Sequence, residues 1–263
     1  MEATGAGKHG CGLKSRPPAG KRCNSALRGT QSCESHFLSL NCSPEFLYLP
    51  QNLVDLQKRE STLDLNLKDN VVMITGGSRG IGKAIALAFA REGARLSLCA
   101  RTEQTLQQAA KEIEAVGGPV FHQTADVTST DEAAAFVEAT LSHYGRIDVL
   151  VNNVGGSRRT PTLEISDEEW HELLDLNAVT AARMSRLVIP AMKTQGHGVI
   201  IMISSIYGRE SGGHITYNAG KAAEISLAKT LAREFAPDNI RVLSVAPGSI
   251  LFEGGSWWRK QQA

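Results

Sequence analysis

The sequence lacks a long apolar run and lacks an excess of charge of either sign. No stretch approaches the roughly 18 apolar residues that a membrane-spanning helix needs. The 28 lysines and arginines nearly balance the 27 acidic residues, so the net charge is +1. This balance gives no reason to expect binding to nucleic acid or to an acidic membrane surface. We therefore expect a soluble protein with no nucleic-acid partner and no membrane partner.

Cysteines are few, and their placement is uneven. Four of the five lie before residue 60, and only Cys99 lies beyond it. They lack the paired short spacing of a zinc site and do not form the pattern of a secreted disulfide scaffold. We expect reduced thiols, a cytoplasmic protein and no metal site. Cys99 ends an apolar strand and is expected to be a small core residue.

The first 64 residues contain much Gly, Ser, Pro, Lys and Arg and show no sustained helical or strand period. This composition predicts a disordered extension. Up to Arg28 the only acidic residue is Glu2, so an organelle-targeting peptide is an alternative. Clear amphipathic helicity and a secretory apolar segment are both missing. We therefore favour an extension without a function of its own.

From residue 65 onward, short apolar strands alternate with amphipathic helices. This alternation predicts an α/β domain over residues 65–263, a Rossmann-type doubly wound parallel sheet with helices on both faces and strand order 3-2-1-4-5-6. Ser166 and Glu169 predict a capping box at the start of one long helix that continues toward Met192. The expected strands are 71–75, 95–100, 120–125, 148–152, 199–203 and 241–245, and a further long helix is expected over 217–236.

A glycine-rich turn joins the first expected strand to the helix after it. Gly76 and Gly80 allow backbone torsions and close approaches that a Cβ would block, and Gly82 lets the helix lie against the strand. The unpaired N–H groups at the helix start favour an anion such as a diphosphate. A tight turn without a ligand is the alternative, but the strand and helix on either side favour dinucleotide binding.

The end of the second expected strand indicates which dinucleotide binds. An acidic residue there would bind the free ribose 2′-hydroxyl of NAD, but the chain has Ala100 followed by Arg101. A guanidinium pairs well with a 2′-phosphate, and Arg79 adds a second positive charge, so we expect NADP(H). Arg101 could instead only solvate a helix start. Asp126 could meet the adenine or cap the next helix.

Tyr217 and Lys221 lie four residues apart on a strongly helical segment and therefore share one face. A nearby ammonium stabilises a phenolate and brings the tyrosine pKa closer to neutral pH. Isolated pairs with this spacing are common and usually have no function. This pair lies one strand and loop after Ser204 and Ser205, and the order adds weight to a catalytic interpretation.

At this point the sequence resembles the short-chain dehydrogenase/reductase family over about residues 66 to 250. Within the family it is most similar to reductases of the 3-oxoacyl-carrier-protein type. The motifs that carry the resemblance, in the order and spacing of the family, are Thr75–Gly82, Asn152–Gly155, Asn177, Ser204–Ser205, Tyr217–Lys221 and Pro247–Gly248.

The resemblance implies a catalytic set. Tyr217 would be the general acid toward a carbonyl or the base toward an alcohol, and Lys221 would bind the nicotinamide ribose and lower the tyrosine pKa. A serine would hydrogen-bond the substrate oxygen, and Asn177 would hold a water in a proton relay. Ser205 fits the motif and Ser204 fits the spacing; we choose Ser205, and the alternative stays open.

The glycine turn, the strand ends and the resemblance together predict an NADP(H) site and a small-molecule carbonyl or alcohol substrate. Two departures from the family pattern are Val154, in place of alanine, and Gly220, which replaces serine and weakens the helix by roughly 1 kcal/mol. The residues expected at the cofactor are Thr75, Gly76, Ser78, Arg79, Gly80, Ile81, Gly82, Arg101, Asp126, Val127, Asn153, Gly155, Tyr217, Lys221, Pro247 and Gly248.

Family members continue through a covering loop, a further helix and a seventh strand, whereas this sequence ends at Ala263. We therefore expect a domain truncated before the seventh strand, with the sixth strand as an open sheet edge. The homo-oligomer usual in the family is then in doubt. The alternative to an active oxidoreductase is a truncated, catalytically silent nucleotide-binding protein.

Overall fold

The computed structural model describes residues 65–252 and 255–262. The chain divides into two units, Met1–Arg59 and Glu60–Ala263, and every described residue belongs to the second. The extension predicted over residues 1–64 lies outside the described residues.

Six parallel strands form one sheet in the order β3-β2-β1-β4-β5-β6. The predicted fold class and strand order are therefore confirmed. β6 is the edge strand of the described sheet, as expected, and its Leu243 and Val245 are exposed. Because the strands are parallel, their carboxyl ends meet at one edge. The strands are β1 (Val71–Thr75), β2 (Arg95–Ala100), β3 (Val120–Thr124), β4 (Val149–Asn152), β5 (Gly198–Ile203) and β6 (Ile240–Val245).

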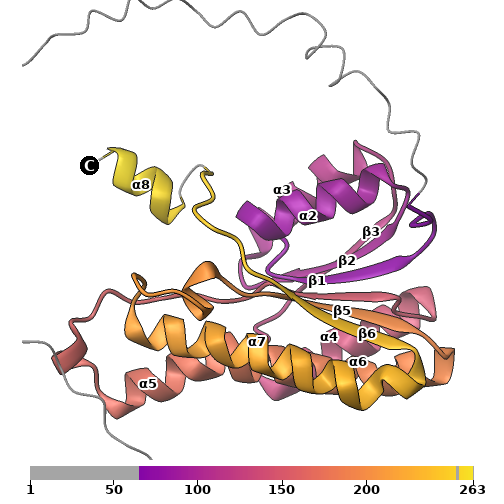
Figure 1. Ribbon diagram of the computed structural model, residues 1–263. Helices are drawn as coiled ribbons and strands as arrows, with labels where there is room; N and C mark the ends of the chain where they lie inside the picture. Colours follow the sequence, from indigo (N-terminus) through magenta and orange to yellow (C-terminus); the bar gives the residue numbers. More distant parts are fainter. Residues whose placement is uncertain (1–64, 253–254, 263) are drawn as a thin grey trace, which may run out of the picture. The chain divides into compact units, whose positions relative to one another are not determined.

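Helices cover both faces of the sheet, with α2 and α3 on one side and α4, α6 and α7 on the other (Figure 1). Strand residues alternate between the two faces accordingly: Ile74 joins an apolar cluster with Leu106, and Met73 joins another with Phe136 and Met184. The helices are α2 (Gly80–Arg91), α3 (Glu103–Glu114), α4 (Thr130–Tyr144), α5 (Asp167–Leu174), α6 (Thr180–Gln195), α7 (Ile215–Phe235) and α8 (Ser256–Gln262), with short 3₁₀ turns η1 (Thr162–Glu164), η3 (Ile206–Gly208) and η4 (Ala236–Asp238).

The long helix predicted from residue 166 toward 192 is interrupted. A π-helical turn, η2 (Asp175–Val179), separates α5 from α6. Within it, the Asn177 side chain donates to the Leu173 carbonyl at 2.8 Å and so enters the helical hydrogen-bond ladder. The predicted capping box is only half formed. Ser166 accepts from the Glu169 N–H, whereas the Glu169 carboxylate accepts from Thr160.

Asp148 joins the beginnings of three strands. Its carboxylate is almost fully buried and accepts from the Val71 N–H at 2.8 Å, and it lies 2.5 Å from Arg146 and 2.9 Å from His197 Nε2. Burial raises the pKa of Asp148, but these hydrogen bonds outweigh burial and bring the pKa below its usual value. The carboxylate therefore pins the amino ends of β1, β4 and β5.

Within the described residues, no helix is long and apolar enough to cross a membrane.

Candidate active site

The glycine turn fits a diphosphate. Gly76 and Gly80 have φ of +67° and +56°, and a Cβ on Gly82 would lie 2.3 Å from the Gly76 carbonyl oxygen. Helix α2 has no acidic residue in its first turn, and its N-cap, Arg79, makes no side-chain capping hydrogen bond. The N–H groups at its start are therefore left for an anion.

Two of the residues expected at the cofactor hold the turn in place. The Asn153 side chain donates to the carbonyls of Thr75 and Gly76 at 3.0 and 3.1 Å. The Thr75 hydroxyl accepts from the Asn153 N–H at 3.0 Å. These bonds tie the ends of β1 and β4 together, so the shape of the turn depends on a loop that is nearly 80 residues away in the sequence.

Phe252 lies against the turn. A Cβ on Gly80 would lie 2.8 Å from Phe252 Cζ, so the aromatic ring rests directly on this glycine. Nothing in the local sequence pattern indicated this contact, because it joins the segment after β6 to the start of α2.

The carboxyl ends of β2 and β3 bring Arg101 and Asp126 near each other. The Arg101 side chain is 73% exposed, and its guanidinium lies 3.9 Å from Asp126 Oδ2. Asp126 Oδ1 accepts from the N–H and the hydroxyl of Thr128, at 3.0 and 2.7 Å. One carboxylate oxygen thus shapes the turn before α4, while the other faces Arg101. Arg79 is also exposed, and Val127 is buried.

Tyr217 and Lys221 lie one turn apart near the start of α7, at the carboxyl edge of the sheet. Lys221 is 3% exposed, and its Nζ lies 5.8 Å from the centre of the Tyr217 ring. The ammonium donates to the Ile203 carbonyl at 2.9 Å and to Glu224 Oε1 at 3.0 Å. The two side chains share a face as predicted, and Lys221 has a carboxylate partner that the sequence analysis missed.

The pKa of Tyr217 is raised, opposite to the direction expected from the sequence. Burial of the phenol is the main cause, and the negative charge of Glu224 adds to it, while a hydrogen bond with Ser205 opposes both. The physical reason for the difference is that the phenol is buried, which disfavours the charged phenolate, and that a buried carboxylate, Glu224, lies beside the ammonium that was expected to stabilise it.

The two candidate serines point to different partners. The Ser204 hydroxyl donates to the main-chain carbonyl of Lys221 at 2.7 Å, so it anchors α7 to the end of β5. Ser205 accepts from the Tyr207 N–H at 3.2 Å and lies close enough to Tyr217 to lower the pKa of its phenol. The geometry therefore favours Ser205 as the serine beside the tyrosine hydroxyl.

Asn177 is fully buried, and its side chain is paired with backbone. Its amide nitrogen donates to the Gly156 carbonyl at 2.9 Å, and its oxygen accepts from the Gly156 N–H at 3.1 Å. A Cβ on Gly155 would lie 2.8 Å from both Asn177 Oδ1 and Lys221 Nζ, and a Cβ on Gly220 would lie 2.8 Å from the Asn177 Cβ. Both glycines thus allow η2, α7 and the loop after β4 to approach one another, which accounts for the departure at Gly220.

The loop after β6 borders the same edge. The Pro247 carbonyl accepts from the Ile206 N–H at 3.1 Å, which fixes it beside η3, and a Cβ on Gly248 would meet open space.

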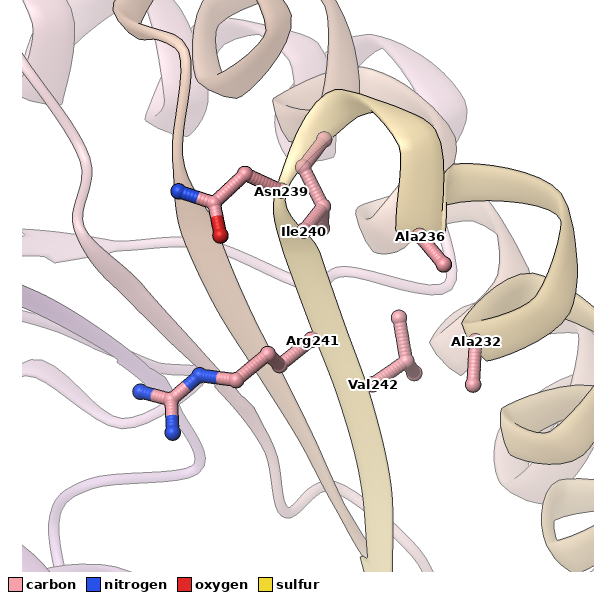
Figure 2. A pocket seen from close by; sticks show the side chains of 6 residues that line it. All are labelled: Ala232, Ala236, Asn239, Ile240, Arg241 and Val242. Atoms are coloured by element: carbon pink, nitrogen blue, oxygen red, sulfur yellow. The ribbon is translucent and has the colours of Figure 1, made fainter.

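A cavity of about 300 Å³ lies at the other end of β6, lined by Ala232, Ala236, Asn239, Ile240, Arg241 and Val242 (Figure 2). It is at the amino end of the strand and away from Tyr217, whereas open α/β sheets bind ligands at the carboxyl ends.

Comparisons with known proteins agree with this geometry. A family model described as short chain dehydrogenase matches residues 70–262. The chain is 38% identical over 187 residues to the 3-oxoacyl-(acyl-carrier-protein) reductase FabG of Thermotoga maritima. The matched segment covers 71% of this chain and 76% of the relative. A short-chain dehydrogenase/reductase structure from Burkholderia xenovorans is 33% identical, with a TM-score of 0.70 over 74% of this chain and 81% of that chain. The structure of NAD⁺-bound xylitol dehydrogenase is 29% identical, with a TM-score of 0.70 over 74% of this chain and 75% of that chain. The parallel sheet, the glycine turn and the Tyr217–Lys221 pair are thus those of a protein that belongs to the short-chain dehydrogenase family.

Proposed function

We propose that this protein is an NADP(H)-dependent oxidoreductase that moves hydride between the nicotinamide and a carbonyl or alcohol substrate. Its family is one of oxidoreductases that use a nicotinamide cofactor. The observation that carries the proposal is the placement of Tyr217 beside Ser205 and one turn from Lys221, at the carboxyl edge of the sheet. The glycine turn lies at the same edge.

Each residue of the site has a defined task. The nicotinamide supplies or accepts the hydride when the cofactor is bound. Tyr217 donates its phenolic proton to the carbonyl oxygen in reduction, and its raised pKa keeps that proton in place at neutral pH. Ser205 hydrogen-bonds the same oxygen, and Lys221 holds a positive charge behind the phenol. Asn177 holds the loop after β4, and with it Gly155, in position.

The choice of NADP(H) rests on charge. Arg101 at the carboxyl end of β2 is exposed, and no carboxylate occupies that position to accept from a ribose 2′-hydroxyl. Arg79 adds a second exposed guanidinium at the glycine turn. Because the chain is also similar to a structure with bound NAD⁺, the affinities for NADPH and NADH are the first quantities to measure.

The relative from Thermotoga maritima suggests a 3-oxoacyl thioester as the first test substrate. The full-length protein is mixed with NADPH or NADH and with a 3-oxoacyl thioester or a panel of ketones, and the nicotinamide absorbance is followed. We expect oxidation of NADPH in preference to NADH and, for Tyr217→Phe, a loss of turnover of about 10²-fold or more with retained cofactor binding. Binding of NADPH without turnover of any carbonyl would overturn the enzyme proposal and support a silent nucleotide-binding protein.

A further inference from the structure

Glu224 is a carboxylate buried beside the lysine of the proposed active site. It is 0% exposed and lies three residues after Lys221 on α7. Lys221 Nζ lies 3.0 Å from both carboxylate oxygens, and only the contact to Oε1 has hydrogen-bond geometry. The second oxygen makes no hydrogen bond to any described residue. An acidic side chain is thus held in the interior chiefly by Lys221, and Ser204 also lies close enough to lower its pKa.

Burying both charges is unfavourable, so the pair persists only because each charge compensates the other. Burial lowers the pKa of Lys221, and the charge of Glu224 opposes that change. Burial likewise raises the pKa of Glu224 to about 7, against the charge of Lys221. Without the carboxylate, the main-chain carbonyl of Ile203 would be the remaining hydrogen-bond partner of the ammonium in the described structure, and a carbonyl carries no full charge.

Other charged groups do not replace this partner. Within the described part of the chain, Glu224 forms its ion pair with Lys221 alone. Several acids on elements packed against α7 or in the site's loops are engaged elsewhere: Glu172 with Arg158, Asp175 with Arg183, and Asp238 with Lys193. The titratable groups on the elements packed against α7 are Asp167, Glu168, Glu169, His171 and Glu172 on α5, Asp175 on η2, Tyr207 on η3, Asp238 on η4 and Arg241 on β6.

We propose that Glu224 is a positioning residue: its carboxylate keeps Lys221 protonated inside the protein and holds the ammonium between Ile203 and the loop at Gly155. The inference rests on the proposed function, since Lys221 matters to catalysis only if hydride transfer takes place at this site. Glu224 is 0% exposed and is hydrogen-bonded to Lys221, so it acts through Lys221 and through the effect of its charge on the pKa of Tyr217.

The direct test observes the Lys221 proton without cofactor. The full-length protein is labelled with ¹³C at lysine Cε and titrated by NMR, and the Lys221 signal is assigned by its absence in Lys221→Met. In Glu224→Gln we expect the Lys221 midpoint to fall by at least about one pH unit, a tenfold loss of proton affinity. Glu224→Asp, which keeps the charge, should lie closer to the wild-type protein. Glu234→Gln, an exposed acid on the same helix, should leave the midpoint unchanged.

A midpoint for Lys221 that is the same in Glu224→Gln and in the wild-type protein would overturn the proposal. If Glu224→Gln does not fold, the wild-type titration decides. A Lys221 midpoint below neutral pH in the wild-type protein would then overturn the proposal as well, because the carboxylate would not be keeping the ammonium protonated.

Turnover separates this inference from the proposed function. If the enzyme reduces a carbonyl, Glu224→Gln should lose activity at alkaline pH values at which the wild-type protein keeps it, because Lys221 loses its proton earlier. A wild-type protein without turnover would refute the proposed function and leave the NMR result standing. An active Glu224→Gln protein with unchanged pH dependence and an unchanged Lys221 midpoint would refute the role of Glu224 alone.

Discussion

Replacement of Gly82 by alanine tests the glycine turn, because two effects of known size oppose each other there. Helix propensity favours alanine over glycine by about 1 kcal/mol inside a helix, so propensity alone predicts a more stable protein. The new Cβ would, however, lie 2.3 Å from the Gly76 carbonyl oxygen and 2.6 Å from Asn153 Nδ2. Both are held by the hydrogen bonds that join β1 to β4 and cannot move away cheaply.

The overlap requires a shift of about 1 Å between α2 and the turn, and overpacking of this kind costs typically about 1–3 kcal/mol. The clash should therefore cancel or outweigh the gain in propensity, with a net loss of up to about 2 kcal/mol. For a domain of this size that corresponds to a fall in melting temperature of up to about 4–8 °C. NADPH affinity should fall at least about tenfold, because the helix N-terminus no longer meets the diphosphate in the same place.

Urea unfolding and titration of NADPH by nicotinamide fluorescence measure the two effects. Ala84→Gly, on the exposed side of α2, calibrates helix propensity, and Gly248→Ala adds a methyl group in open space and should change stability by less than about 0.5 kcal/mol. A Gly82→Ala protein that is about 1 kcal/mol more stable and binds NADPH normally would refute the reasoning.

Three further predictions concern other parts of the domain. Asp148→Asn should lower the free energy of unfolding by about 2 kcal/mol at neutral pH, because its donors lose a charged acceptor. Since the folded pKa of Asp148 is depressed, its stabilisation is present above the ordinary value of 3.8 and is lost as the pH falls through the folded pKa, so urea unfolding of the two proteins should converge in acid. Phe252→Ala should uncover Gly80 and strengthen NADPH binding in a fluorescence titration, and weaker binding would show that the ring supports the cofactor. Arg101→Ala should weaken NADPH binding far more than NADH binding, and equal weakening would show that Arg101 does not contact the 2′-phosphate.

The strand order and the glycine turn could be predicted from the sequence because their causes are local. Apolar strands a few residues long and amphipathic helices between them are visible within short windows, and the crossover rule then orders the sheet. The torsions of Gly76 and Gly80 follow from the residue type itself. Tyr217 and Lys221 share a face because helical geometry places residues four apart together.

The features that the sequence analysis missed depend on contacts between distant residues. The helical pattern around Asn177 continues without a break, and the π turn there is accompanied by hydrogen bonds to Gly156, 21 residues earlier. The choice between Ser204 and Ser205 depends on which hydroxyl is already bonded to the main chain of α7, and that contact joins Ser204 to a carbonyl 17 residues away. The three-residue spacing of Lys221 and Glu224 was a usable signal for an ion pair, but it could not show that the pair is buried.

The sequence by itself determined the α/β architecture, the glycine turn and the face that carries Tyr217 and Lys221, because backbone torsion and side-chain periodicity depend on neighbours in the chain. Only the tertiary structure decided the surroundings of the site: that Ser204 is bonded to the main chain of α7, that Phe252 rests on Gly80, and that Lys221 forms a buried ion pair with Glu224. The physical reason is that a pKa depends on burial and on charges within a few ångströms, and packing sets both.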